Sequence, residues 1–560
     1  MAETLLSPGV LARETDQSFI QGQPLQAGAA IVGPAAKGPV GIPTLVTSPS
    51  EYEAIFGGIV VSGSQQYSYL TRTSAQNYFS QGGDSLLVTR VVSGSFTGAT
   101  STPINNTNGD SAFTLETLDE GVLANSATGT KDNIKWEITG VDIDRGLFSL
   151  LVRRGDDIHK SKTILETFSN LSLDPKAPNY ITKRIGNTTF SIDTTDVDPY
   201  VKSDGEFVNQ SKYLRVSTVN TPTLDFFDNN GDVDVADKNR IPLASSGSFS
   251  GATGDLFPGA AARFGKAISG AGNIQGLTHT DYTESLDLLS NTDDYKFNLI
   301  SVPGLNHTDH AATVNKAVTL AETRQDCIAI VDLRPYGATV ANVTTSATAF
   351  DSSYAATYWP WLQTIDPSTA QTVWVPASTM IPGVYAFTDR SSEAWFAPAG
   401  LTRGALGNVT KAERKLTAGN RDKLYTSNVN PIATFPGQGV VVFGQKTLQK
   451  KSSALDRVNV RRLLIELKSY ISQVADNLVF EQNSIATRNG FLTTVNPYLE
   501  GIQQRQGLYA FKVVMDETNN TADVVDRNEL IGQIYLQPTK TAEFIMLDFN
   551  VTPTGASFPA

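Results

Sequence analysis

One short passage occurs twice in this sequence, and the repeat constrains the fold more than any other feature. The segment Ser93-Gly94-Ser95-Phe96-Thr97-Gly98-Ala99-Thr100 recurs at 246–253 with a single Thr-to-Ser change. Both copies have the Ser/Gly-rich composition of flexible links. The residues between them are rich in Thr, Asn and Asp, with short β-like runs at 134–138, 147–153 and 189–192. We therefore expect one or two β-rich outer domains, inserted at 93–253 through a surface loop of a host domain.

The host is expected to be an α/β domain that the insertion splits into residues 27–92 and 254–379. Strand-like and helical stretches alternate in both parts, and this alternation favours a parallel sheet with right-handed crossovers. In the second part, Thr308 or Asp309 is expected to cap the helix. The expected strands are 29–32, 44–46, 85–92, 295–302 and 326–333, and the expected helices are 49–56, 68–80 and 309–323.

The two ends of the chain differ from this pattern. Residues 1–26 contain few core-forming side chains and offer only brief extended segments such as Val10-Leu11-Ala12, so they are interpreted as an arm. Helical apolar spacing predicts one long helix from Ser453 to Arg488, which Asn489-Gly490 should end. In the last segment, 541–560, alternation predicts a strand with one apolar face. That face consists of Ile545, Leu547, Phe549 and Val551.

Composition excludes several classes of function. The chain has 560 residues and a net charge of −12, and its Lys and Arg residues are scattered, whereas nucleic-acid binding needs a concentrated basic surface. Its single cysteine, Cys327, lies in an apolar run and is interpreted as a buried small side chain. Neither a membrane-spanning apolar run nor a signal-peptide pattern is found. We therefore expect no direct nucleic-acid partner, no membrane insertion and assembly in a cytoplasm.

Three passages imitate chemical sites. His307 and His310 lie close together but have no visible partner ligands, and a helix-starting loop explains them. Residues 439–447 imitate a phosphate loop, yet their β-branched centre indicates a buried strand. Asp228, Asn230 and Asp232 resemble the start of a calcium loop whose later positions fail, so a solvated acidic turn is favoured, with weak calcium binding as the alternative. The sequence thus predicts no catalytic, cofactor-binding or metal-binding residues, and no enzyme.

A series of short motifs resembles the tail sheath family of contractile phages and related injection machines. Each motif alone is weak, but their order and spacing together are specific. They include Ser7-Pro8-Gly9-Val10, Ala30-Ile31-Val32-Gly33, Thr47-Ser48-Pro49, Val88-Thr89-Arg90-Val91, Tyr358-Trp359-Pro360-Trp361, Val375-Pro376-Ala377-Ser378, Asn430-Pro431-Ile432 and Val458-Asn459-Val460-Arg461-Arg462-Leu463.

The resemblance implies a mixed α/β and α+β multidomain protein with a conserved sheath core domain at 380–540. In the family this domain faces an inner tail tube, and the arm 1–26 joins it. The implied function is a structural subunit that polymerises helically around the tube and contracts to drive it through the host envelope during genome delivery. The implied partners are further copies in stacked hexameric rings, the tube protein, the baseplate and the tail terminator or neck proteins. The implied location is the virion tail.

The device expected to link the copies is strand exchange, in which both chain ends complete a neighbour's sheet. The predicted exchange residues are Val10, Leu11, Ala12, Ile545, Leu547, Phe549 and Val551. Four basic residues could meet an acidic tube surface, although solvation or an internal salt bridge is the favoured interpretation for them. They are Lys450, Lys451, Arg461 and Arg462.

Three alternatives remain open at this point. The chain could form the sheath of a bacteriocin or another non-phage injection system. It could also be a non-contracting virion surface protein, which would share most of these features. An enzyme is the weakest alternative, because the loop at 303–308 of the βαβ pattern has one glycine and lacks a nucleotide-binding fingerprint.

Overall fold

The computed structural model describes residues 25–62, 65–125, 129–195, 199–224, 226–228, 230–254, 277 and 279–543. Its centre is an eight-stranded sheet in the order β25-β24-β20-β19-β18-β2-β6-β3. Neighbouring strands are parallel from β6 to β24, and β3 and β25 add antiparallel edges. These strands are β2 (Ala29–Gly33), β3 (Thr44–Val46), β6 (Leu86–Arg90), β18 (Leu299–Asn306), β19 (Ile328–Asp332), β20 (Ala355–Trp359), β24 (Asn430–Phe435) and β25 (Gly439–Val442).

Because β2 pairs with β18, segments from both sides of the insertion share one sheet. Strands β24 and β25, which come from the range 380–540, continue the same sheet. The strands are continuously apolar because helices cover both faces. One face packs on α1 (Pro49–Phe56), α2 (Leu70–Ser80) and α9 (Ile381–Ser391). The other packs on α6 (His279–Leu288), α7 (His307–Arg324), α8 (Val340–Ala347) and α11 (Ala418–Thr426).

The predicted βαβ unit is confirmed, since α7 connects the parallel strands β18 and β19. Its cap differs from the prediction. Asn306 accepts a hydrogen bond from the Asp309 amide at 3.1 Å, so neither Thr308 nor Asp309 caps the helix. The apolar residues before Asn306 assign it to the strand when the sequence is considered alone. Its capping role becomes evident only from the turn between β18 and α7.

The insertion forms a second eight-stranded sheet, ordered β12-β11-β10-β16-β7-β9-β15 with β8 paired to β9. The predicted β-like runs all lie in strands. Trp136, Phe113 and Phe148 form the centre of its core. The sheet comprises β7 (Thr100–Ser101), β8 (Ile104–Asn105), β9 (Ser111–Thr117), β10 (Ile134–Asp142), β11 (Leu147–Arg154), β12 (Ile164–Leu171), β15 (Leu214–Val219) and β16 (Ser245–Ser250).

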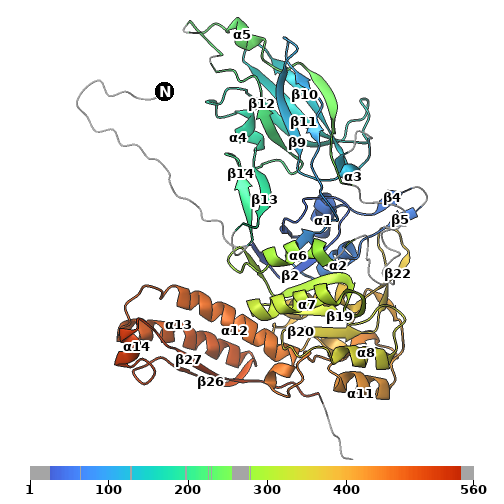
Figure 1. Cartoon of the computed structure of the whole chain (residues 1–560), viewed down its shortest axis with the longest axis vertical. Coiled ribbons are helices and arrows are strands. Elements are labelled where there is room, and N and C mark those ends of the chain that lie inside the picture. The colour runs from blue at the N-terminus through green and yellow to red at the C-terminus, as the bar shows by residue number, and fades with distance from the viewer. Residues whose placement is uncertain are drawn as a thin grey trace, which may run out of the picture.

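Figure 1 shows the insertion above the central sheet, with a hairpin of β13 (Thr189–Asp193) and β14 (Tyr200–Asp204) between the two bodies. From this hairpin, Ile192 and Val201 pack against the core of the central domain. The insertion therefore contacts the central domain through this hairpin as well as through its two connecting segments.

The two Ser/Gly-rich copies are not the flexible links that their composition predicts. Most of the second copy belongs to β16, where Phe249 and Ser250 pair with Ser101 and Thr100. The Thr97 amide donates to the Thr253 carbonyl at 3.1 Å, and the two threonine hydroxyl oxygens are 2.8 Å apart. The prediction was wrong because cross-strand hydrogen bonds, which local composition does not reveal, hold both copies side by side.

The C-terminal module follows the central domain and lies to one side of it (Figure 1). It contains α12 (Val458–Asp476), α13 (Ile485–Gln504), α14 (Ala522–Asp526), and the strands β26 (Leu508–Val514) and β27 (Gln533–Pro538). The predicted single helix from Ser453 to Arg488 is therefore wrong. Ser484 accepts a hydrogen bond from the Thr487 amide and starts a new helix, and Gly490 lies inside that helix. This N-terminal cap outweighs the apolar spacing on which the prediction rested.

Candidate assembly site

The strands β26 and β27 form an antiparallel hairpin that is a two-stranded sheet on its own. Within the described residues, the outer edge of neither strand has a strand partner. On one face of the hairpin, Phe511, Val513 and Leu536 pack on the helices α12 and α13. On the other face, Lys512 pairs with Tyr535, whose side chain is 57% exposed. A sheet with one apolar buried face and two free edges can accept further strands.

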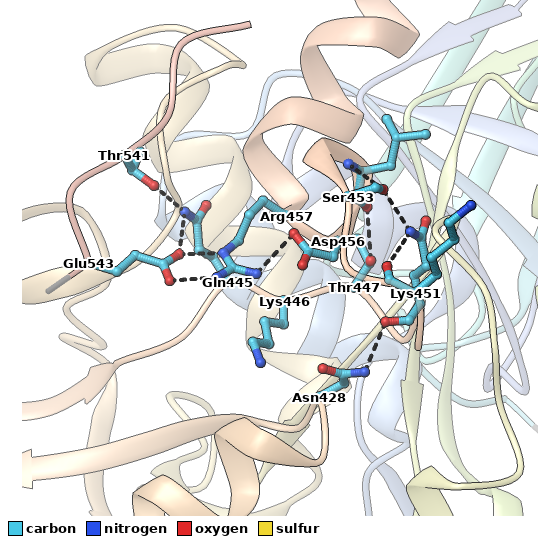
Figure 2. A network of polar contacts seen from close by, with 12 residues as sticks. Asn428, Gln445, Lys446, Thr447, Lys451, Ser453, Asp456, Arg457, Thr541 and Glu543 are labelled. Atoms are coloured by element: carbon cyan, nitrogen blue, oxygen red, sulfur yellow. Dashed lines mark hydrogen bonds and ion pairs between the residues drawn. The ribbon is translucent and has the colours of Figure 1, made fainter.

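A polar cluster, the anchor, holds the chain directly after this hairpin. It consists of Glu543, Thr541, Arg457, Gln445 and Tyr425 (Figure 2 draws the first four). The Arg457 guanidinium donates to both carboxylate oxygens of Glu543, at 2.7 and 2.9 Å. The Tyr425 hydroxyl donates to the same carboxylate at 2.8 Å, and the Gln445 amide donates to Thr541 at 2.6 Å and to Glu543 at 3.1 Å. The anchor thus fixes residues 541–543 against the central domain.

The electrostatics of the anchor follow from this pairing. Burial opposes the charge of Arg457, but the hydrogen bond to Glu543 and the nearby Tyr425, Glu543 and Asp456 charges together outweigh burial and raise the pKa of Arg457. Burial raises the pKa of Tyr425, and the nearby Glu543 charge adds to the effect, so its hydroxyl stays a donor. Burial and the Arg457 charge lower the pKa of Lys446. A groove of about 560 Å³ lies beside the anchor, lined by Arg457, Asn459, Lys540 and Glu543 among others.

The four basic residues proposed to meet a tube separate into two pairs. Lys450 and Lys451 are exposed. Arg461 and Arg462 are only 4% and 5% exposed, so the structure corrects the prediction for this second pair. The Arg461 guanidinium lies 4.0 Å from the ring centroid of Tyr354.

Arg462 donates to Asp389 at 2.6 Å, and its guanidinium lies 4.8 Å from the ring centroid of Tyr385. The internal salt bridge, which is the favoured interpretation of these residues, is therefore found for Arg462. The two arginines lie on the face of α12 that packs toward the central domain, which their adjacency in sequence does not reveal.

The predicted exchange residues lie outside the described residues, so strand exchange stays a prediction. These residues are Val10, Leu11, Ala12, Ile545, Leu547, Phe549 and Val551. The anchor is not predictable from local sequence. Tyr425 and Arg457 contact Glu543 across separations of 118 and 86 positions, and no local pattern joins them. The hairpin had a weak signal in the alternation of Ile534 and Leu536 with polar neighbours.

The three imitations of chemical sites have structural roles. The His307 ring packs edge-on against Phe350, with centroids 4.7 Å apart. Val440 to Val442 form a buried strand, as predicted. Asp228 accepts backbone hydrogen bonds from Asn230 and Asp232 and closes a turn. Within the described residues, no group of three His, Cys, Asp or Glu side chains could hold a metal ion.

No described helix combines the length and the apolar character needed to cross a bilayer.

Comparisons with known proteins define the class of this chain. The family model described as phage tail sheath protein central domain matches residues 275–448, and that of the phage tail sheath C-terminal domain matches 450–552. The tail sheath protein of Vibrio phage KVP40 is 34% identical over 336 residues, which cover 55% of this chain and 50% of that protein. The tail sheath protein of Enterobacteria phage T4 is 35% identical over 266 residues, covering 44% and 40%. The chain spans half or less of the length of these curated relatives.

A crystal structure of a sheath tail protein from Listeria innocua has the same fold, with a TM-score of 0.53. It is 11% identical and covers 92% of this chain and 95% of its own. The chain belongs to the contractile phage tail sheath family.

Proposed function

We propose that this chain is the sheath subunit of a contractile phage tail, which polymerises helically around an inner tube and contracts to drive the tube through the host envelope. Membership of the sheath family supports this role. The observation that supports the assembly mechanism is the hairpin β26–β27, whose outer edges have no strand partner among the described residues, beside the anchored segment 541–543. Its partners are further copies in stacked hexameric rings, the tube protein, the baseplate and the terminator or neck proteins. Its place is the virion tail, after assembly in the host cytoplasm.

Strand exchange would use the hairpin as the acceptor. A strand that joins a free edge gains a ladder of backbone hydrogen bonds, and the apolar pockets of the sheet select its side chains. Ile545, Leu547, Phe549 and Val551 would supply the apolar face from one neighbour, and Val10, Leu11 and Ala12 a second strand from another. Because such links are extended, rigid subunits can rotate and slide while the lattice stays connected.

The domain division belongs to the same proposal. The arm 1–26 and the range 380–540 would form the tube-facing part of each subunit, and the terminal strand would lie in 541–560. The split α/β domain, at 27–92 and 254–379, would carry the outer domain at 93–253. Lys450 and Lys451, which are exposed, remain the candidates for contact with the tube.

Truncation and a matched set of substitutions test this function. Deleting residues 1–15 or 548–560 should leave a folded subunit, by circular dichroism, that forms no hollow tubes in electron micrographs. Replacing Leu547 and Phe549 by Asp should abolish tubes, because it places charge on the apolar face. The same replacement at Met546 and Asn550, on the intervening face, should spare them. Tubes formed by the truncated chains would contradict strand exchange, and a full-length chain that never forms rings or tubes would contradict the sheath function.

A further inference from the structure

The connection between α12 and α13 presents a phenylalanine entirely to solvent. Phe480 is 103% exposed, and its backbone is left-handed, with φ of 70°. Two apolar neighbours are also exposed, Val479 at 61% and Ile485 at 60%. We call these three side chains the knob. A left-handed backbone is strained for a bulky side chain, and exposure of an aromatic ring to water is unfavourable.

Neither the strained backbone nor the exposed ring stabilises the subunit, yet hydrogen bonds support the backbone of this connection. The Val479 amide donates to the Asp476 carbonyl at 3.2 Å, and the Glu481 amide donates to the Leu478 carbonyl at 3.0 Å. The Asn483 side chain donates to the Glu529 carbonyl at 2.9 Å, which ties the connection to the loop before β27. Strain that a structure maintains in this way is typical of interaction sites, since a preformed contact loses less entropy on binding.

The charges around the knob indicate which surface would receive it. Asp476 and Glu481, both exposed, flank Phe480 in sequence and give this connection two negative charges. A complementary surface would be aromatic and basic, because a cation is attracted to carboxylates and to the face of a ring.

This chain carries such a surface elsewhere, which we call the aromatic patch. Phe435 and Phe443 contact each other edge-on with centroids 5.0 Å apart. The Arg421 guanidinium lies 5.4 and 5.9 Å from the two ring centroids. Phe443 is 45% exposed, and the neighbouring Lys423 is exposed as well. The patch lies where α11 meets the end of β24 and the segment after β25.

The knob and the patch cannot meet within one molecule. In Figure 1, α13 and α14 lie at one side of the lower half, and α11 lies at the other. The knob follows the far end of α12, whose 19 residues extend about 28 Å. Contact between two different patches of identical chains is heterologous, and such contacts generate rings or open helices.

We infer that the knob of one copy binds the aromatic patch of a second copy. This contact would link subunits in addition to any exchanged strands. The inference rests on the proposed function in requiring that copies assemble. The inference specifies which two surfaces are in contact. It can therefore be wrong even if the copies assemble as proposed.

Cysteine cross-linking tests the contact directly. The native cysteine, Cys327, is completely buried, so background cross-linking should be low. The variants Phe480→Cys and Phe443→Cys are mixed, allowed to assemble and oxidised. A disulfide-linked dimer on a non-reducing gel is expected from the mixture and from neither variant alone. Phe480→Cys mixed with Phe190→Cys, an exposed phenylalanine of the insertion, is the matched control and should give no dimer.

Charge reversal and a glycine variant provide an independent readout. Glu481→Arg or Arg421→Glu alone should raise the concentration needed for assembly at least tenfold, and the two together should restore it. Phe480→Gly should weaken assembly without lowering the midpoint of thermal unfolding, because glycine relieves the strain at φ of 70°.

Wild-type tubes that give no cross-link, and no effect of charge reversal, would overturn the inference while leaving the proposed function intact. Absence of any self-association by the wild-type chain would overturn both.

Discussion

Asp332 is a buried carboxyl group at the end of β19. Its Oδ1 accepts a hydrogen bond from the Ser378 amide at 3.2 Å, and within the described residues its Oδ2 has no partner. Burial outweighs the Ser378 hydrogen bonds and raises the pKa of Asp332 from 3.8 to about 7. The folded chain therefore holds a proton that the unfolded chain releases between these two values.

For Asp332 the sign of the pH dependence follows from this raised pKa. Its contribution to stability is fully present below pH 3.8 and is lost as the pH rises through about 7. Asp332→Asn should remove this loss, so that the variant unfolds at a higher temperature than the wild type at pH 8. Differential scanning fluorimetry from pH 4 to 8 measures it, with the exposed Asp204→Asn as control. Equal pH slopes for Asp332→Asn and the wild type would contradict the burial argument.

The burial of Arg462 gives a second prediction at the residue scale. Arg462→Ala leaves Asp389 without its guanidinium partner and removes packing from Tyr385. Asp389 is 39% exposed, so the expected loss lies between those of buried and surface pairs, at about 2 kcal/mol. Lys451→Ala, at an exposed site, should change stability by less than about 0.5 kcal/mol. Urea unfolding of both full-length variants measures this, and equal values would argue against the buried pair.

Among the elements, the two repeated segments place equivalent phenylalanines in different surroundings. Phe249 is 1% exposed in the insertion core. Phe96 is half-buried, with its ring beside Gly121 and Gly254 and 5.1 Å from the Arg90 guanidinium. Phe249→Ala should therefore cost about 4 kcal/mol, as for other buried aromatic truncations, and Phe96→Ala clearly less. Calorimetry of the full chain compares the two, and similar losses would show that the surroundings are equivalent.

The sequence predicts those elements whose own residues determine them. The run Ile328 to Val331 is apolar on both faces, and such a run specifies a central strand wherever it is placed. The split of the predicted long helix could not be seen in the same way, because the apolar spacing continues past Asp476 and only the cap at Ser484 interrupts it. The pairing of the repeated segments and the anchor depend on contacts between distant residues. Composition therefore indicates flexible links for the repeated segments and gives no signal for the anchor.

At the scale of the whole molecule, the anchor connects the central domain to the segment that follows β27. Glu543→Gln keeps the shape of the side chain but removes the charge that Arg457 pairs with. We expect little change in subunit stability, since the central core does not depend on this ion pair, but slower assembly, because the segment 541–543 is held less firmly. Light scattering during assembly measures the rate. Asp204→Asn, in an exposed ion pair of the insertion, is the control, and equal rates for the two variants would contradict a guiding role.

The side-by-side position of Thr97 and Thr253 has a practical consequence. The chain enters and leaves the insertion at adjacent positions, so the insertion can be exchanged as a unit. A foreign domain whose own ends lie close together could be grafted between these residues while the central sheet keeps its connections. In evolution the same arrangement would let the exterior of such a particle diversify while its moving parts are inherited unchanged.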